Sequence, residues 1–167
     1  MPSNASRSRR SAAVVVLAAA LALPGCSWFG NDAEPTVEGT ETSVFDVQPG
    51  QCFNPPAQFE SENSEIPQLP CDQPHTLEAY ALVGYVAPGG GTADAYPGDT
   101  ALTTFADGAC AQEFAGYVGV SYQDSSLFFT YLLPSARSWE LNADRTVICF
   151  VTTTGQQLTA SVAGSRL

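Results

Sequence analysis

Lysine is absent from this chain of 167 residues, and histidine occurs only once, at position 75. Six arginines oppose 17 acidic residues, which gives a formal net charge of −11. Because clustered cations are needed to bind a phosphate backbone, this composition excludes nucleic acid as a partner. The chain also lacks a Cys-x-x-Cys pair, and one histidine does not complete an ordinary zinc ligand set. We therefore predict no metal site and no cofactor.

An apolar run long enough to cross a bilayer is also missing. The longest run, Ala12–Leu23, is shorter than the roughly 20 residues that a spanning helix needs. It follows three arginines and ends at Pro24-Gly25-Cys26, which is the layout of an export signal with its cleavage site. A cysteine directly after the cleavage site resembles a bacterial lipobox. Residues 1–25 are thus predicted to be a lipoprotein signal peptide, with Cys26 lipidated; plain secretion is the alternative.

Loss of the signal peptide would make the chain still more acidic. Three arginines would remain against 17 acidic residues, a net charge of −14. Since such a surface repels anionic head groups, we expect contact with the cell membrane, at its extracytoplasmic face, to come from the lipid anchor. Residues 26–43 carry little apolar surface and are predicted to form a disordered acidic tether.

Four cysteines remain once Cys26 is assigned to the lipid: Cys52, Cys71, Cys110 and Cys149. In an exported chain these are expected to form two disulfides. Four cysteines allow three connectivities, and the sequence does not choose between them. We favour bonds between neighbours, Cys52–Cys71 and Cys110–Cys149.

Residues 44–167 suffice for one domain. Alternating, β-branched or aromatic side chains predict strands at 44–47, 76–86, 127–133, 146–152 and 157–162. Residues 54–70 contain four prolines and are predicted to be a loop. In the strand at 76–86, Leu77, Ala79, Ala81 and Val83 are expected on one face, opposite Glu78, Tyr80 and Leu82. The strand at 127–133 is interpreted as a central strand buried on both faces, with an exposed interaction strip as the alternative.

Apolar side chains recur every three or four residues from Leu102 to Val118, which predicts the main helix. Asp99 is the expected N-cap and Gly119 the expected C-cap, and Cys110 should face the core. Strands, one helix and then strands in hairpin succession favour an α+β fold. The prediction is a single small domain with a mainly antiparallel sheet, one principal helix and two disulfides.

Short motifs recur in order along most of residues 49–165. They are Gly50-Gln51-Cys52-Phe53, Pro70-Cys71-Asp72-Gln73-Pro74-His75 with Glu78, Tyr96-Pro97-Gly98, Cys110 with Phe114, Tyr117-Val118-Gly119, Pro134 with Trp139, Asp144-Arg145 before Cys149, and Gly164-Ser165. In this order they resemble the actinobacterial septum-formation family. Gln51 stands where the family usually has Asp, and Ala143 where it usually has Gly. The resemblance implies a role in division or in the cell envelope, and it supplies no catalytic mechanism.

Two groups of polar residues are candidates for a site. His75 with Asp72 and a serine, Ser125 or Ser126, would resemble a hydrolase triad, but no nucleophile-elbow motif accompanies them. We predict that His75 hydrogen-bonds a loop and that the chain has no catalytic residue.

Trp139, Asp144 and Arg145 form the second group, which could clamp a carboxylate ligand. The interpretation that we favour is a local Asp144–Arg145 ion pair that fixes a turn, with Trp139 in the core. His75, Trp139, Asp144 and Arg145 are the candidate binding residues.

The function that these observations favour is that of a membrane-anchored lipoprotein whose stapled domain is a non-catalytic binding or scaffold module. Its expected partners are an envelope or division protein or a cell-wall glycan. The alternative is an envelope hydrolase or transferase that uses His75.

Overall fold

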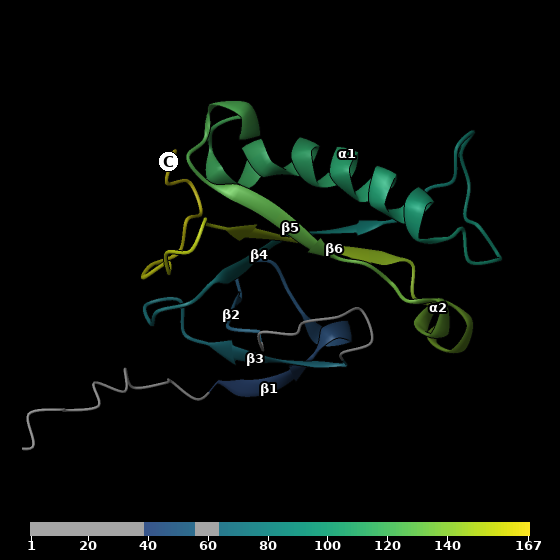
Figure 1. Ribbon diagram of the computed structural model, residues 1–167, viewed down its shortest axis with the longest axis horizontal. Helices are drawn as coiled ribbons and strands as arrows, with labels where there is room; N and C mark the ends of the chain where they lie inside the picture. The colour runs from purple at the N-terminus through teal and green to yellow at the C-terminus, as the bar shows by residue number, and fades with distance from the viewer. Residues whose placement is uncertain (1–38, 56–63) are drawn as a thin grey trace, which may run out of the picture. The chain divides into compact units, whose positions relative to one another are not determined.

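Six antiparallel strands form one sheet in the order β1-β3-β2-β4-β6-β5 (Figure 1). The computed structural model describes residues 39–55 and 64–167. Its strands are β1 (Thr40–Ser43), β2 (Cys52–Phe53), β3 (Glu65–Leu69), β4 (Leu77–Gly84), β5 (Phe128–Leu132) and β6 (Thr146–Thr152). Its helices are α1 (Asp99–Val118) and α2 (Ala136–Asn142), with short 3-10 turns η1 (Val44–Asp46) and η2 (Tyr122–Asp124). The predicted α+β class, with one principal helix, is confirmed.

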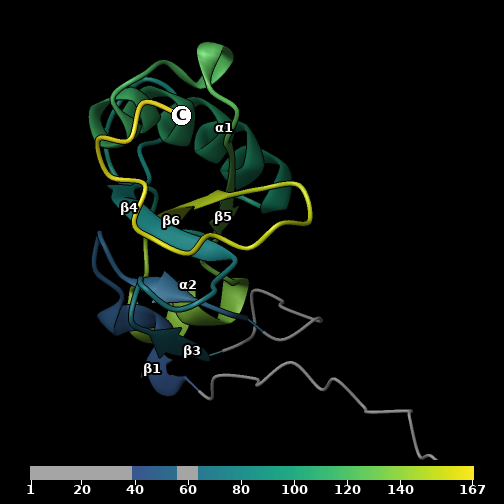
Figure 2. The same cartoon turned by 90° about the vertical axis from the view of Figure 1, so that its left-hand side faces the viewer.

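Helix α1 covers one face of the part of the sheet formed by β4, β6 and β5 (Figures 1 and 2). The predicted stripe is confirmed, since the residues that α1 buries are four apart: Leu102, Ala106, Cys110, Phe114 and Val118. All of them except Leu102, which packs with Tyr85 and Trp139, meet the side chains of alternate β6 residues, Val147, Cys149 and Val151, in a helix-side core. Burial of this stripe gives the helix a stability that its own hydrogen bonds would not supply.

A second core lies on the other face of the central strands, where β2 and β3 turn beneath β4 (Figure 1). Ile148 and Phe150 of β6 point into it, and Phe150 meets Phe53 edge to face at 5.9 Å. Strand β6 is thus buried on both faces, which explains its unbroken apolar run.

A β-bulge in β4 changes which side chains face which core. Ala79 pairs with Phe150 but Ala81 pairs with Cys149, so the register shifts between them. One extra residue in a strand reverses the alternation beyond it. Leu77 and Ala79 therefore pack in the second core, whereas Ala81 packs under α1. The prediction that these residues share one face is wrong, because alternation alone does not reveal a bulge.

The ends of the two helices use positive φ angles. At α1 the C-cap is Gly119, as predicted, with φ 87°. The N-cap is Gly98 and not Asp99, which is the first helical residue and accepts a hydrogen bond from the Tyr96 hydroxyl. Ala143 ends α2 with φ 52°, a left-handed conformation in which a Cβ costs energy. A glycine at this position would avoid that cost.

Both favoured disulfides are present. Cys110 of α1 is bonded to Cys149 of β6, which ties the helix to the middle of the sheet. Cys52 of β2 is bonded to Cys71, two residues after β3. The predicted connectivity is confirmed.

Several predicted elements are wrong because pairing across the sheet overrides the local signal. Residues 44–46 form η1, and the strand begins earlier, at Thr40, within the predicted tether. Residues 65–69 form β3 despite Pro67, since β1 and β2 pair with it on either side. The rest of the predicted tether, the signal peptide and Cys26 lie outside the described residues.

The end of the chain also differs from prediction. Residues 157–162 make only an isolated bridge between Leu158 and His75. Strand β5 lies at an edge of the sheet, so the interpretation as a central strand is wrong, and Phe128 is 41% exposed. Helix α2 was not predicted; its start is fixed by reciprocal hydrogen bonds between Ser135 and Ser138.

Candidate functional site

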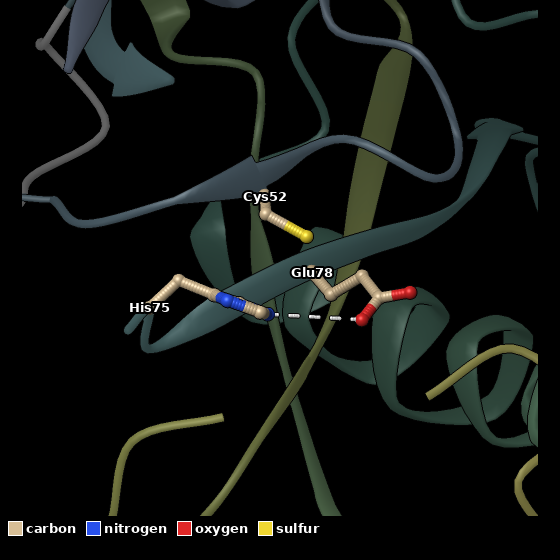
Figure 3. Close-up of side chains that lie close together, drawn as sticks. All are labelled: Cys52, His75 and Glu78. Atoms are coloured by element: carbon tan, nitrogen blue, oxygen red, sulfur yellow. Dashed lines mark ion pairs between the residues drawn. The ribbon is translucent and has the colours of Figure 1, made fainter. Parts of the chain in front are cut away.

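His75 and Glu78 are buried together where the chain enters β4 (Figure 3). Both side chains are 0% exposed, and His75 Nε2 lies 3.8 Å from Glu78 Oε2. The other ring nitrogen, Nδ1, donates to the Gln73 carbonyl at 2.8 Å, since a carbonyl can only accept. The His75 amide donates to the Leu158 carbonyl, and the Leu158 amide donates to the His75 carbonyl. The prediction that His75 hydrogen-bonds a loop is confirmed.

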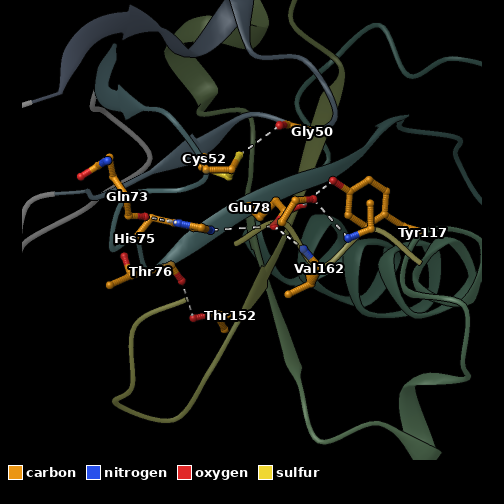
Figure 4. Close-up of polar contacts among 12 residues, drawn as sticks. Gly50, Cys52, Gln73, His75, Thr76, Glu78, Tyr117, Thr152 and Val162 are labelled. Carbon is orange, nitrogen blue, oxygen red and sulfur yellow. Dashed lines mark hydrogen bonds and ion pairs between the residues drawn. A yellow bond between two sulfur atoms is a disulfide. The ribbon is translucent and has the colours of Figure 1, made fainter. Parts of the chain in front are cut away.

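The Glu78 carboxylate joins three segments of the chain (Figure 4). Its Oε1 accepts from the Tyr117 hydroxyl at 2.5 Å and from the Ser161 hydroxyl at 2.6 Å. Its Oε2 accepts from the Val162 amide at 2.9 Å. Tyr117 belongs to α1, whereas Ser161 and Val162 follow the last strand. One buried carboxylate thus anchors the C-terminal segment to the helix and to the sheet.

The protonation of this group follows from its surroundings. Burial alone would raise the pKa of Glu78, but His75 and the three hydrogen-bond donors outweigh it and lower the pKa below its ordinary value. Burial, together with the hydrogen bond to Glu78, raises the pKa of Tyr117. The stable form is therefore a carboxylate that accepts from a neutral phenol.

The surroundings of His75 do not form a metal site. Cys52, His75 and Glu78 each place one candidate ligand atom within 4.8 Å of the others. However, the Cys52 sulfur is bonded to Cys71 and has no thiolate to offer. His75 Nε2, which has no hydrogen-bond partner among the described residues, faces only the Glu78 carboxylate as a ligand.

The candidate hydrolase residues have other contacts. It is Glu78, and not Asp72, that pairs with His75, and Asp72 is exposed. The Ser125 hydroxyl donates to the Leu167 carbonyl at 2.6 Å and accepts from the Leu127 amide. Ser126 is exposed, and no hydrogen bond joins it to His75. The geometry among the described residues therefore does not assemble the alternative hydrolase triad.

The half-buried Arg145 stacks on the buried Trp139. The Arg145 guanidinium carbon lies 3.7 Å from the centroid of the Trp139 ring, which is 1% exposed. The guanidinium donates to four main-chain carbonyls, those of Ala93, Asp94, Trp139 and Asp144, at 2.8–3.3 Å. Trp139 is in the core, as predicted. Arg145 ties the chain before α1 to the end of α2.

Asp144 has a separate structural role. Its carboxylate accepts from the Thr146 amide and from the Ser138 hydroxyl, both at 3.0 Å. The only ion pair within residues 39–55 and 64–167 joins His75 and Glu78, so the predicted Asp144–Arg145 ion pair is wrong. Although both residues lie in the turn between α2 and β6, Asp144 bonds to Thr146 and Ser138, whereas the Arg145 guanidinium donates to main-chain carbonyls.

An open cleft lies between η1, α2 and the side of β5 and β6 that is turned away from α1. Its volume is about 520 Å³, which is within the roughly 300–1,000 Å³ typical of small-molecule sites. Phe45, Leu82, Leu132 and Ile148 are among its apolar lining residues, and Phe45 is 51% exposed. Of the predicted binding residues, only Asp144 lines this cleft.

Sequence reasoning did not find the cleft. Its lining comes from segments as far apart as Val44 and Ile148, and their meeting depends on the fold of the sheet. The only available signal was Arg137, one of the three arginines that follow residue 25, and nothing in its local sequence distinguishes it.

Within the described part of the chain, no helix is both long and apolar enough to span a membrane. A family model described as "Septum formation" matches residues 49–165. Searches of curated proteins and of solved structures found no match to the chain. The matched range contains the His75–Glu78 pair, both disulfides and most of the cleft lining.

Proposed function

This chain belongs to the septum-formation family, and from that premise we propose that it is an exported, lipid-anchored binding or scaffold module without catalytic activity. Membership of the family indicates a role in cell division or in the cell envelope. The proposed anchor is lipid on Cys26, at the extracytoplasmic face of the cell membrane. The proposed partners are an envelope or division protein or a cell-wall glycan.

The observation that carries the non-catalytic part of this proposal is the burial of His75. A general base must come within about 3 Å of the proton that it removes from a substrate. His75 is 0% exposed, with one nitrogen bonded to Gln73 and the other facing Glu78. By contrast, the cleft beside α2 is open and has the size of a binding site. The accessible chemistry of this domain therefore supports binding.

Replacement of Cys26 by alanine is expected to abolish lipidation, because the thiol is the proposed acylation site. Cells that express the wild-type chain or the variant would be labelled with a clickable fatty acid, and the protein would be captured and imaged. The wild-type protein should carry the label and the variant should not. Ser27→Ala, a change at the next residue, should retain the label. Equal labelling of Cys26→Ala and the wild-type protein would refute the proposed anchor.

Replacement of His75 by asparagine tests the absence of catalysis. Asparagine keeps a donor near the Gln73 carbonyl and removes the imidazole that could act as a base. We expect the variant to support normal division in a deletion strain, with a Tm lowered by a few degrees. Complete loss of function at an unchanged Tm would favour the hydrolase or transferase instead.

Localisation of the tagged protein in the same cells should show enrichment at septa.

A further inference from the structure

The cleft between η1 and α2 mixes polar and apolar surface. Seven apolar and eight polar residues line it. The apolar part includes Phe45 and Leu82, which are 51% and 37% exposed. Large apolar side chains that gather at one open hollow mark a binding site more often than single exposed ones do. The polar part includes Gln48 and Asn142, whose side-chain amides can pair with the amide groups of a ligand.

Arg137 provides the only positive charge in the cleft lining. Its side chain is exposed, and among the residues that the structure describes it has neither an ion pair nor a hydrogen bond. This contrasts with Arg145, which is held by four carbonyls. In a chain without lysine and with 17 acidic residues, an unpaired guanidinium beside an apolar hollow is suited to one anionic group.

Asp144 limits how much negative charge the cleft can accept. It also lines the cleft, and the pairing of its oxygens with Thr146 and Ser138 holds it in place. One guanidinium near one fixed carboxylate favours a ligand with a single negative charge over a phosphate, which carries between one and two. A planar carboxylate also matches the two parallel donors of a guanidinium.

We propose that this cleft binds a short peptide segment that has a carboxylate next to aliphatic side chains, with Arg137 as the partner of the carboxylate. This inference rests on the proposed function as a binding module and adds the ligand class. The nearly equal numbers of polar and apolar lining residues fit a peptide, whose amides need partners and whose side chains need apolar contacts. A lone acyl chain would leave the polar residues unpaired.

The test is a titration of the full chain in detergent micelles with short peptides, in which binding is measured from the backbone amide chemical shifts. The probes are N-acetylated tripeptides in all combinations of alanine, valine and leucine, as free acids and as C-terminal amides. A third set carries glutamate at the first position and a C-terminal amide, which separates a side-chain carboxylate from a terminal one. At least one of the carboxylate-bearing peptide sets should change the backbone amide chemical shifts of Ser138 and Thr146. These peptides should bind at least tenfold more tightly than the uncharged C-terminal amides.

Variants of two arginines provide the matched comparison. Arg137→Gln should weaken binding at least tenfold, whereas Arg166→Gln changes the net charge equally outside the cleft lining and should have little effect. Equal affinity for acids and uncharged amides, no shift in the cleft, or unchanged binding by Arg137→Gln would overturn the inference. So would binding of phosphatidylglycerol vesicles that competes with the acids. Each of these results is independent of Cys26 labelling and of septal localisation, which test the proposed function.

Discussion

Replacement of Cys110 and Cys149 together by alanine is expected to lower the free energy of unfolding by about 4 kcal/mol. The disulfide closes a loop with a sequence separation of 39 residues, and loop-closure entropy assigns roughly that amount to a loop of this length. Both cysteines are 0% exposed, so the lost sulfur atoms add a packing cost. Small domains have only about 5–15 kcal/mol of net stability, so the change would remove a large share.

The matched control is the double replacement of Cys52 and Cys71 by alanine. Its loop has a sequence separation of 19, for which the same estimate gives about 3 kcal/mol. Urea unfolding under oxidising conditions should therefore rank the Cys110–Cys149 variant as the less stable. Both doubles avoid an unpaired thiol, which a single replacement would leave. The reverse ranking would show that strain or packing, and not loop length, controls the contribution of each bond.

Replacement of Glu78 by glutamine is expected to lower the free energy of unfolding by about 3 kcal/mol. Glutamine has nearly the same shape, but one acceptor oxygen becomes a donor, so Tyr117, Ser161 or Val162 loses its acceptor. A buried unsatisfied group costs about 1–3 kcal/mol, and hydrogen bonds to a charge are worth about 1.5–3. Tyr117→Phe removes a single donor and leaves the charge in place, so a smaller loss, of about 1.5 kcal/mol, is expected.

The stability of the Glu78→Gln variant should depend on pH differently from that of the wild-type protein. Folding lowers the pKa of Glu78, so the unfolded chain binds the proton more tightly than the folded chain does. The ionised Glu78 therefore makes its full contribution to the free energy of unfolding above the unfolded pKa of about 4.5. It is lost as the pH falls through the lower folded pKa. The stability difference between the wild-type protein and Glu78→Gln, from urea unfolding, should therefore shrink as the pH falls below about 4.5. A difference that stays constant or grows on acidification would contradict the ionised state of Glu78. Hydrogen exchange at the Val162 amide should be faster in the variant at neutral pH.

The elements that the sequence predicted correctly are those whose signal is local. The stripe from Leu102 to Val118 repeats at the helical period, and Gly119 supplies the left-handed cap. Strand β6 has the predicted bounds, 146–152. A strand buried on both faces is apolar along its whole length, and this run can be seen in the sequence without knowledge of the neighbouring strands.

The elements that were missed depend on distant partners. Strand β3 contains Pro67 and exists because β1 and β2 pair with it. The bulge after Ala79 is set by register against β6, which no property of β4 alone reveals. Helix α2 has only seven residues, too few for a periodic signal, and Trp139 buries against the chain that precedes α1.

The candidate site divides in the same way. His75 was identifiable as the single histidine, yet its partner is Glu78, and its burial comes from the bridge to Leu158. Arg145 was expected to pair with Asp144, with a ligand clamp as the alternative, but its donors end on carbonyls. Arg137 was not selected, although its side chain is the one that faces an open cleft.

The sequence by itself determined the acidic charge, the class of the fold and the four cysteines available for pairing, because composition and short-range periodicity are properties of the chain alone. Tertiary structure decided the burial of Glu78, the use of each arginine and the position of the cleft. These depend on which groups the fold removes from water and brings within hydrogen-bond distance. The free energy of a buried charge is set by neighbours far along the chain, and the order of residues does not name them.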